Sequence, residues 1–512
     1  MMARWFEPAE ALSDADVGRS MRLVLSDGLT TQVMGTLTGG VFLTAYALHA
    51  GASNMLVGLL AAIPFLAQLA QLPAILLVER LRRRRLVVVV SSGLGRLALL
   101  AAGFGVLLPP GPALALLICG LLLHAGFGAV SGCGWNSWMR DLMPVDRLGS
   151  FFGRRLFHMT LLGAVLSYGA GLAVDARLAQ APGSESEVYS LLFVAGAAAG
   201  LAGVGLLALT PEPRMPPRVA REPLRRLLAE PFRDANFRRL MLFLGSWSFA
   251  VNLASPFFTV YMLTRLGMGM AEVMPLVVFS QFVNMGFLRL WGRLSDGYGN
   301  KPVLALCGPL YILCFLGWTF TTLPEPHGLT LPLLYLLHAL MGIATAGVTL
   351  ASANIALKLS PQGKATAYLA MNGVISSLAA GIAPIVGGAF ADFFAARELS
   401  LAVRWSAPGQ ALSFDALSLQ HWDFFFLMAC AIGFYSLHRL SLVREVGEAT
   451  NRTLLRQVLV EARRGIYNVS SAAGLRWLAG IPAAELMRSR PPARRDAPAG
   501  NDDARPAALH SA

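Results

Sequence analysis

The chain has 512 residues, of which 55% are hydrophobic and only 14% are charged, and its formal net charge is +13 at pH 7. Soluble domains carry about 25% charged residues, so this composition excludes an ordinary soluble protein and indicates a membrane protein. The five cysteines show no paired spacing, which predicts neither disulfides nor a metal site.

Apolar segments recur along the whole chain. Residues 1–23 are polar and contain no short apolar core with a cleavage site, so we expect a cytoplasmic N-terminal segment and no removable signal peptide. Each later apolar run has about 20 residues and can cross ~30 Å of hydrocarbon as a helix. The twelve runs cover residues 24–48, 53–77, 86–108, 113–137, 155–175, 190–209, 239–263, 272–291, 302–322, 331–357, 366–391 and 423–442. The sequence therefore predicts an all-α membrane protein with twelve transmembrane helices.

Basic residues gather in alternate loops between the expected spans. These loops contain Arg80 to Arg85, Arg140 to Arg155, Arg214 to Arg239, Lys301, Lys358 and Lys364. The positive-inside rule places them, and both termini, in the cytoplasm. A nucleic-acid-binding surface would not alternate with span number, so we expect no nucleic-acid partner. Arginine far outnumbers lysine, which is typical of a GC-rich bacterial genome and favours the cytoplasmic (inner) membrane of a bacterium.

The sequence contains an internal repeat with an offset of about 215 residues. Segments 42–48 and 122–128 recur as 257–263 and 336–342, and Gly171 and Asp175 recur as Gly388 and Asp392. Such a duplication predicts two six-helix halves, residues 24–209 and 239–442, related by an axis along the membrane normal. A basic cytoplasmic linker, residues 210–238, joins them. Residues 443–512 are expected to form a cytoplasmic tail that is partly amphipathic and then disordered.

A charged, glycine-rich loop separates the expected eighth and ninth spans and reads GRLSDGYGNKP from Gly292 to Pro302. It resembles the loop signature of the major facilitator superfamily of secondary transporters, G-x-L-[SA]-D-x-x-G-x-[KR]-[PR]. In the first half, Glu79 stands at the place of Asp296 and Arg84 at that of Lys301. The resemblance implies a gate loop that latches the two halves together on the cytoplasmic side in the outward-open state. Its residues would be Gly292, Asp296, Gly299, Lys301, Glu79 and Arg84.

The same loop has a simpler interpretation. Asp296 lies at the end of one expected helix and Lys301 just before the next, so the pair can bridge the turn. The loop would then only cap helices and set topology.

Ionisable side chains inside the spans are candidates for coupling, because they are costly within a bilayer. Asp27 lies about one turn inside the first span, and Arg96 lies halfway along the third without an obvious acidic partner. No span has a carboxylate near its centre, which argues against a buried acidic proton relay. His124 lies near the middle of the fourth span, and His338 holds the repeat position in the tenth. His124 could exchange a proton near neutral pH, or it could be a neutral histidine in a helix contact.

Other polar and aromatic side chains predict a mostly apolar substrate cavity. The candidates are Thr38, Gln68, Phe127, Trp135, Asn136, Trp247, Asn252, Gln281, Asn284, Thr345 and Asn354. Some could instead pack between helices, because polar side chains hydrogen-bond across membrane helix contacts. Tyr46 and Tyr261 lie toward the outer ends of their spans, and we interpret both as interfacial anchors.

Few buried charges and several aromatic residues favour a small neutral or amphipathic organic solute. The sequence thus predicts a monomeric secondary transporter that works by alternating access, with proton coupling as an open possibility and no cofactor. Its partners would be a small-molecule substrate and the lipid bilayer. A lipid or lysolipid flippase on the same fold and a non-transporting membrane sensor remain alternatives. We expect no enzyme activity, because the sequence has no nucleophile–base pairing, phosphate-binding loop or metal spacing.

Overall fold

The structure is a computed structural model that describes residues 7–10, 12–215, 224–322, 325–361, 365–407, 410–445, 447, 450, 453–458 and 460. The chain divides into two units, Met1–Glu448 and Ala449–Ala512. In the second unit, residues 453–458 are helical. The tail that we expect to be disordered lies outside the described residues.

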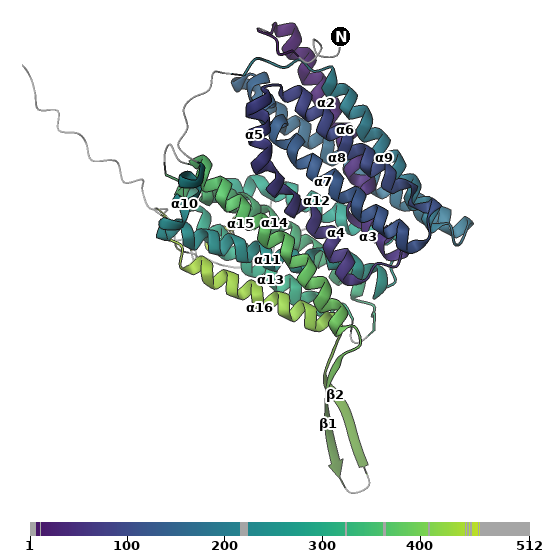
Figure 1. The fold of residues 1–512 in the computed structure, drawn as a ribbon. Helices are drawn as coiled ribbons and strands as arrows, with labels where there is room; N and C mark the ends of the chain where they lie inside the picture. The colour runs from purple at the N-terminus through teal and green to yellow at the C-terminus, as the bar shows by residue number, and fades with distance from the viewer. Residues whose placement is uncertain are drawn as a thin grey trace, which may run out of the picture. The chain divides into compact units, whose positions relative to one another are not determined.

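Long helices make up the first unit (Figure 1). They are α2 (Asp14–Thr38), α3 (Gly40–His49), α4 (Asn54–Ala67), α5 (Gln71–Leu81), α6 (Arg84–Gly103), α7 (Pro110–Leu142), α8 (Val145–Gln180), α9 (Glu185–Ala208), α10 (Leu224–Arg233), α11 (Ala235–Thr264), α12 (Met270–Tyr298), α13 (Asn300–Thr319), α14 (Thr330–Leu359), α15 (Ala365–Phe394) and α16 (Trp422–Ser441). Short 3-10 turns, η1 (Gln68–Ala70) and η2 (Phe104–Leu107), follow α4 and α6. Within the described residues, eleven helices or continuous helix pairs are long and apolar enough to cross a membrane.

The first expected span differs from the prediction. It begins ten residues earlier, at Asp14, because Ser13 and Asp16 form a capping box that starts α2. It is also interrupted at Gly39, which has an extended backbone, and at Gly40, whose φ is +54°. The interruption divides the span into α2 and α3, and neither is counted among the eleven candidate spans. Asp27 consequently lies near the middle of α2 and not one turn inside a span.

We call α2–α9 the N half and α11–α16 the C half. In the N half, α6 packs on α7 and α9, and α2 packs on α8 and α9. In the C half, α11 packs on α15 and α16, while α14 packs on α12 and α13. Figure 1 shows the N half in purple to blue and the C half in teal to yellow.

The two halves contact each other mainly through α4 on α15 and α8 on α12, with α3 also against α11. Glycines allow the close approach of α4 and α15. A Cβ added at Gly388 would lie 2.6 Å from the Met55 Cα, and one added at Gly58 would overlap the Pro384 backbone oxygen. Because α3 and α4 flank the loop at residues 50–53, this contact lies at the end opposite the arginine-rich loops. We call the arginine-rich end the basic end and the other the distal end.

Two features differ from the predicted fold: a β-hairpin in a chain that we expect to be all-α, and a helix within the expected linker. Strands β1 (Glu398–Ala407) and β2 (Gln410–Gln420) form an antiparallel hairpin between α15 and α16, which projects away from the helices in Figure 1. Leu399 pairs with Leu419, and the register shifts by a bulge after Leu401. The alternation in LSLAVRW, residues 399–405, is a strand pattern, but a search for 20-residue apolar runs does not detect it. Helix α10 lies in the linker.

Candidate functional site

A buried ionic cluster lies in the N half, on α2, α6 and α8. Asp27 is 3% exposed and stands between two arginines. Its Oδ1 is 3.8 Å from Arg96 Nη2, and its Oδ2 is 3.8 Å from Arg155 Nη2. Arg96 therefore has an acidic partner, contrary to our expectation from the sequence. Asp27 also places a buried carboxylate near the middle of a long helix, although α2 is not among the eleven candidate spans.

Neighbouring backbone and hydroxyl groups hold the two arginines in place. Arg96 donates to the Gly200 carbonyl oxygen on α9 and to the Thr31 hydroxyl at 3.1 Å. Arg155 donates from Nε to the Val24 carbonyl oxygen at 3.2 Å. Gly28 makes room for Arg155, because a Cβ there would lie 2.6 Å from Arg155 Nε. Two fixed cations thus face one carboxylate, and any proton added to Asp27 would remove the only negative charge among the three.

The two repeat-related histidines have different surroundings. His124 makes a 3.2 Å contact from Nδ1 to the Gly95 carbonyl oxygen, next to Arg96 in the chain. His338 bonds the Leu334 carbonyl oxygen of its own helix at 2.8 Å and packs its ring against Trp318. His124 therefore borders the ionic cluster, whereas His338 occupies a packing position.

Trp135 connects the cluster to the C-terminal third of α7. The Arg155 guanidinium lies 5.1 Å from the centre of the Trp135 ring, a cation–π distance. The Trp135 indole nitrogen is buried and donates to no atom of the described residues. An unused buried donor next to a charged cluster is a group that a ligand could satisfy.

The predicted cavity residues fall into two groups. Those with exposed side chains are Gln68, Asn136, Gln281, Thr345 and Asn354. Half-buried Phe127 packs against α6 near Gly95. The others contact the protein itself. Thr38 and Asn252 bond the Met34 and Ser248 carbonyl oxygens of their own helices. Asn284 of α12 bonds Gly342 of α14, and Trp247 of α11 packs against Tyr311 of α13. Tyr46 and Tyr261 are each 2% exposed, so they are buried and are not interfacial anchors.

Two aspartates connect the halves at the distal end. Asp392 of α15 accepts hydrogen bonds from the backbone N–H groups of Asn54 and Met55, which begin α4, at 3.0 and 2.9 Å. Asp175 of α8 accepts them from Met270 and Ala271, which begin α12, at 3.1 and 2.6 Å. Each half therefore caps a helix of the other half. A carboxylate at a helix N-terminus is stabilised by the unpaired N–H groups and by the helix dipole.

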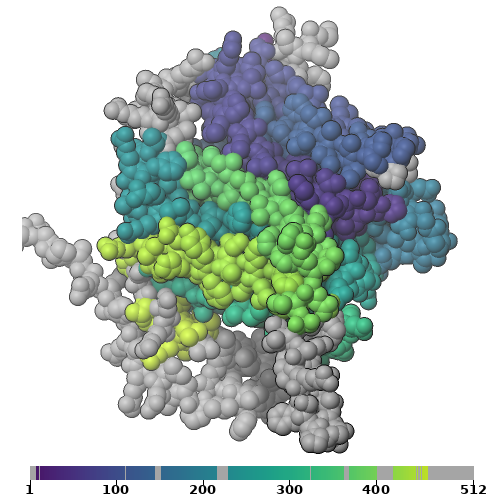
Figure 2. Space-filling view, turned by 60° about the horizontal axis from the view of Figure 1, so that its bottom comes forward, coloured from purple at the N-terminus to yellow at the C-terminus, as the bar shows by residue number. Residues whose placement is uncertain are grey.

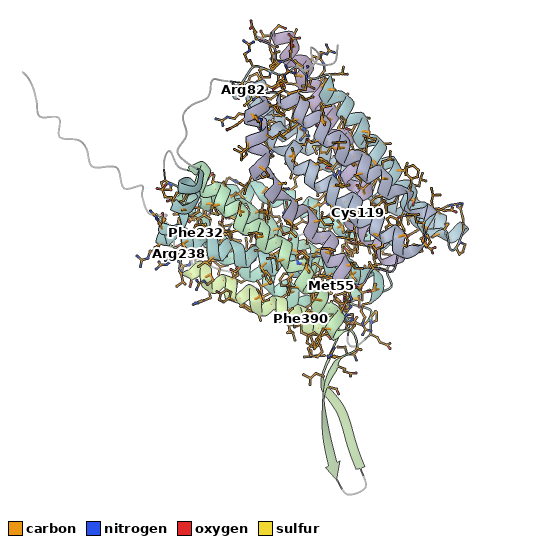
Figure 3. All side chains as sticks on the ribbon, in the orientation of Figure 1. Met55, Arg82, Cys119, Phe232, Arg238 and Phe390 are labelled. Atoms are coloured by element: carbon orange, nitrogen blue, oxygen red, sulfur yellow. The ribbon has the colours of Figure 1, made fainter. Side chains whose placement is uncertain are left out.

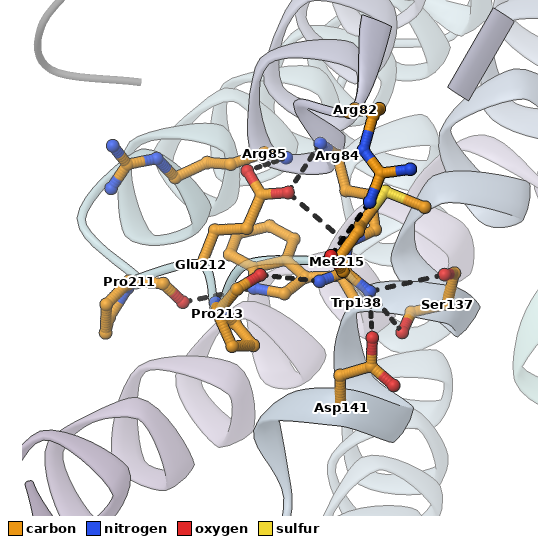
Figure 4. A network of polar contacts seen from close by, with 10 residues as sticks. All are labelled: Arg82, Arg84, Arg85, Ser137, Trp138, Asp141, Pro211, Glu212, Pro213 and Met215. Atoms are coloured by element: carbon orange, nitrogen blue, oxygen red, sulfur yellow. Dashed lines mark hydrogen bonds and ion pairs between the residues drawn. The ribbon is translucent and has the colours of Figure 1, made fainter. Parts of the chain in front are cut away.

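At the basic end of the N half, Glu212 is the centre of a polar network (Figure 4). Its carboxylate accepts hydrogen bonds from the backbone N–H groups of Arg84 and Arg85, at 2.7 and 3.0 Å, and so caps α6. The Arg84 side chain is 0% exposed and forms ion pairs with Glu212 and Asp141. Trp138 donates to the Pro211 carbonyl oxygen at 3.0 Å. Arg84 thus fastens the end of α9 to α6 and α7 within one half.

The C half repeats this arrangement with Glu445. Its carboxylate accepts from the backbone N–H groups of Asn300 and Lys301 at 2.9 and 2.7 Å, and from Lys358 Nζ at 2.8 Å. Burial raises the pKa of the Glu445 carboxyl. The hydrogen bonds from Lys358, Lys301 and Asn300 outweigh burial and leave that pKa below its ordinary value. A glutamate that follows the last helix of each half therefore ties that helix to another of the same half: Glu212 ties α9 to the start of α6, and Glu445 ties α16 to the start of α13.

The acidic residue of the gate loop forms no latch within the part of the chain that the structure describes. Asp296 is exposed and pairs with no side chain among the described residues, so the expected bridge from Asp296 to Lys301 is not formed. Gly299 has a φ of +95° and precedes α13, a conformation that favours glycine. Gly292 is half-buried near Leu350. Glu79 lies at the end of α5 and is half-buried.

Sequence reasoning missed Arg155, Glu212 and Glu445 as site residues. A recognisable signal existed for both glutamates, since each follows the last span of its half by a few residues within an arginine-rich segment. For Arg155, the sequence indicated only a basic loop. Among the described residues, no group of three His, Cys, Asp or Glu side chains could hold a metal ion.

Comparisons with known proteins identify the family of the chain. The sequence profile described as Major Facilitator Superfamily matches residues 28–384 and 290–491. An efflux pump, dotC, from the fungus Dothistroma septosporum is 30% identical over 149 residues, which cover 28% of this chain and 22% of the pump. The chain therefore matches about a fifth of the length of that curated relative.

Three solved structures with a similar fold are each distant in sequence. The nucleoside transporter NupG, in a mutant form, has a TM-score of 0.63 at 13% identity and covers 83% of this chain and 100% of that one. A D-xylose–proton symporter has a TM-score of 0.61 at 13% identity, covering 85% and 99%. A bacterial homologue of the lysosomal transporter Spinster, inward-facing, has a TM-score of 0.56 at 15% identity, covering 85% and 99%. Together with the apolar helices, the family match over most of the chain shows that this is a multi-pass membrane protein of the Major Facilitator Superfamily, with the fold of a transporter.

Proposed function

We propose that the chain is a secondary transporter that moves a small neutral or amphipathic organic solute by alternating access, and that it is not an enzyme. The reciprocal caps at the distal end carry this proposal. Asp392 and Asp175 hold the halves together there through backbone N–H groups of the opposite half. Such contacts exist only while the distal end is closed, so they define one of two states that a rocking motion would exchange.

At the basic end, the charged residues described above do not connect the two halves. Asp296 is exposed and without an ion pair in the described part of the chain, while Glu212 and Glu445 each bind within their own half. With the basic end in the cytoplasm, as the positive-inside rule predicts, this conformation is inward-open. The latch role that we expect for Asp296 then belongs to the opposite, outward-open state.

We further propose that Asp27 couples transport to a proton. Protonation of Asp27 would leave Arg96 and Arg155 facing each other without their shared counter-ion, at 3.8 Å from its oxygens. Like charges in a medium of low dielectric constant repel strongly, so the α2–α6–α8 contact would loosen. His124 is the second candidate, because it contacts the backbone next to Arg96.

The solute class is supported by the exposed polar side chains on apolar helices, such as Asn136, Gln281 and Asn354. Two of the structurally similar proteins are a nucleoside transporter and a D-xylose–proton symporter. Nucleosides and pentoses are therefore the first compounds to test, followed by amino acids, amphiphilic drugs and lysolipids.

The test has two stages. The purified protein is first melted with each compound at pH 5.5 and 7.5, where a ligand at 100 times its Kd stabilises the fold by about 2.7 kcal/mol. Uptake of the stabilising compound is then measured in proteoliposomes that contain a pH-sensitive dye. We expect solute flux with dye response in the wild type, and solute exchange without dye response in Asp27→Asn.

Asp14→Asn is the matched control, because Asp14 is an exposed carboxylate on the same helix. A dye response that persists in Asp27→Asn but disappears in His124→Gln would move coupling to His124. If no compound is transported but labelled lysolipids cross between leaflets, the flippase is the correct reading. If neither solutes nor lipids move, the non-transporting sensor is favoured.

A further inference from the structure

A groove on the C half opens at the basic end, away from the contact between the halves. Its volume is about 540 Å³, within the range of pockets that hold small ligands. All of its lining residues come from α10, α11, α15 and α16, and none comes from the N half. Figure 2 shows α16 in yellow-green lying across this face next to the green α15. The groove is therefore separate from any solute path between the halves.

The groove follows one face of α11 into the membrane. Arg238, Leu242, Gly245 and Phe249 line it at helical spacing and span about 16 Å along the helix axis at 1.5 Å per residue. Gly245 forms part of its wall, where an added Cβ would lie 3.0 Å from Ile375 Cγ2 on α15. Leu242 and Tyr435 are 45% and 54% exposed, so the groove is open sideways to the lipid. Its shape suits an extended hydrocarbon chain.

The interior of the groove offers almost no free polar group. Ser246 lines it, but its hydroxyl already bonds the Phe243 carbonyl oxygen at 3.0 Å and the Ser436 hydroxyl at 3.1 Å. The remaining wall is aliphatic or aromatic apart from the Tyr435 hydroxyl and the Arg238 guanidinium. A hydrated sugar or amino acid would lose its hydrogen bonds there, whereas an acyl chain would lose none.

Positive charge is concentrated at the mouth of this groove. Arg238 is exposed, donates from Nη1 to the Phe232 carbonyl oxygen of α10 at 3.2 Å, and pairs with no carboxylate among the described residues. Figure 3 labels Phe232 and Arg238 at this end of the C half. The Arg439 guanidinium lies 5.8 Å from the centre of the Tyr435 ring, which lines the same groove. Two arginines therefore border an apolar groove where the spans meet the headgroup region.

We propose that this groove binds an anionic glycerophospholipid of the leaflet at the basic end. One acyl chain lies along α11, and the phosphate is bound by Arg238 and Arg439. Arginine pairs with phosphate through several N–H groups, and basic residues at the membrane surface select anionic lipids. The bound lipid joins α10 to the start of α11 and the end of α16.

The experiment measures lipid binding to the full chain, purified in detergent and stripped of lipid, by native mass spectrometry. Phosphatidylglycerol and phosphatidylcholine with identical acyl chains are titrated separately. We expect phosphatidylglycerol to bind more tightly, and its apparent affinity to fall about fivefold for each of Arg238→Gln and Arg439→Gln, which corresponds to about 1 kcal/mol per arginine. Arg22→Gln is the matched control, because Arg22 is an exposed arginine of the N half.

A second pair of variants tests the acyl chain. Ala379→Phe fills the groove from α15, whereas Ala431→Phe adds the same ring at an exposed position of α16 outside the groove. We expect phosphatidylglycerol affinity to fall at least tenfold only for Ala379→Phe, with thermal melting confirming that both variants are folded. Equal binding of the two lipids would overturn the proposal, as would equal loss in Arg22→Gln and Arg238→Gln. Unchanged binding in Ala379→Phe would place the lipid elsewhere and also overturn it.

Discussion

The cap that Asp392 places on α4 allows a quantitative test of the two-state proposal. The substitution Asp392→Asn keeps the shape of the side chain but removes its charge and replaces one acceptor oxygen by a donor. In the present conformation Asp392 accepts three hydrogen bonds, from Asn54 N, Asn54 Nδ2 and Met55 N, at 3.0, 2.9 and 2.9 Å. In a state with the distal end open, the same carboxylate would be hydrated and would lose little by the change.

The size of the effect follows from these contacts. A hydrogen bond to a charged group contributes about 1.5–3 kcal/mol. Asp392 is only half-buried, so water reduces that figure, and we take about 2 kcal/mol for the whole substitution. Because every 1.4 kcal/mol is a factor of ten, the equilibrium should move roughly thirtyfold toward the open distal end.

Spin-label distances in a cysteine-free background measure that shift. Labels at Gln180 and Thr264 report on the distal end, and labels at Leu81 and Arg293 report on the basic end, since all four side chains are exposed. We expect Asp392→Asn to lengthen the distal distance and to shorten the basic one.

Asp234→Asn is the matched control. Asp234 caps α11 within the C half, accepting from Asn236 N and Phe237 N at 2.9 and 3.0 Å. It should lower the melting temperature without moving either distance. The reasoning is refuted if Asp392→Asn leaves both distance distributions as in the wild type, or if Asp234→Asn shifts them equally.

Three further predictions concern the other contacts. Glu445→Gln should lower the unfolding free energy at neutral pH by about 2 kcal/mol. Because the folded pKa of Glu445 is lowered, its contribution is full above the ordinary glutamate value of about 4.3 and is lost below it. Thermal melts of wild type and variant should therefore converge as the pH falls below 4, and a constant difference would contradict this. Arg84→Met leaves Glu212 buried without its ion pair and should cost about 3–5 kcal/mol, measured by the loss of melting temperature; a change below 1 kcal/mol would argue against the network. Gly58→Ala should separate α4 from the Pro384 backbone and favour the open distal end, and an unchanged distal distance would exclude that contact as a determinant.

Much of the fold could be predicted from the sequence because lipid imposes a simple requirement. A helix that crosses hydrocarbon needs a long apolar run, so the apolar runs indicate where the spans lie. The ends of α13 lie within three residues of the expected limits, and those of α16 within one residue. The hairpin β1–β2 was missed because its alternating pattern is short and stands between two spans. The division of the first span at Gly39 was missed because a glycine inside an apolar run does not by itself indicate a break.

The candidate site was only partly predictable. Asp27 and Arg96 could each be identified as candidates, because an ionisable side chain is energetically costly within a membrane. However, 69 positions separate them in the chain, and no local pattern pairs them. Arg155 belonged to an expected basic loop until α8 was found to begin ten residues earlier, at Val145. The repeat relation of Asp175 and Asp392 was visible in the sequence, but it did not show that each caps a helix of the opposite half.

The sequence by itself determined the membrane class, the approximate limits of most spans, the internal repeat and the resemblance to a transporter family, because each depends on local composition or on a short motif. Only the tertiary structure decided which charges meet: Asp27 with Arg96 and Arg155, Glu212 with Arg84, and Glu445 with Lys358. The physical reason is that an ion pair depends on distances of 4 Å or less between side chains, and helix packing sets those distances between segments far apart in the chain.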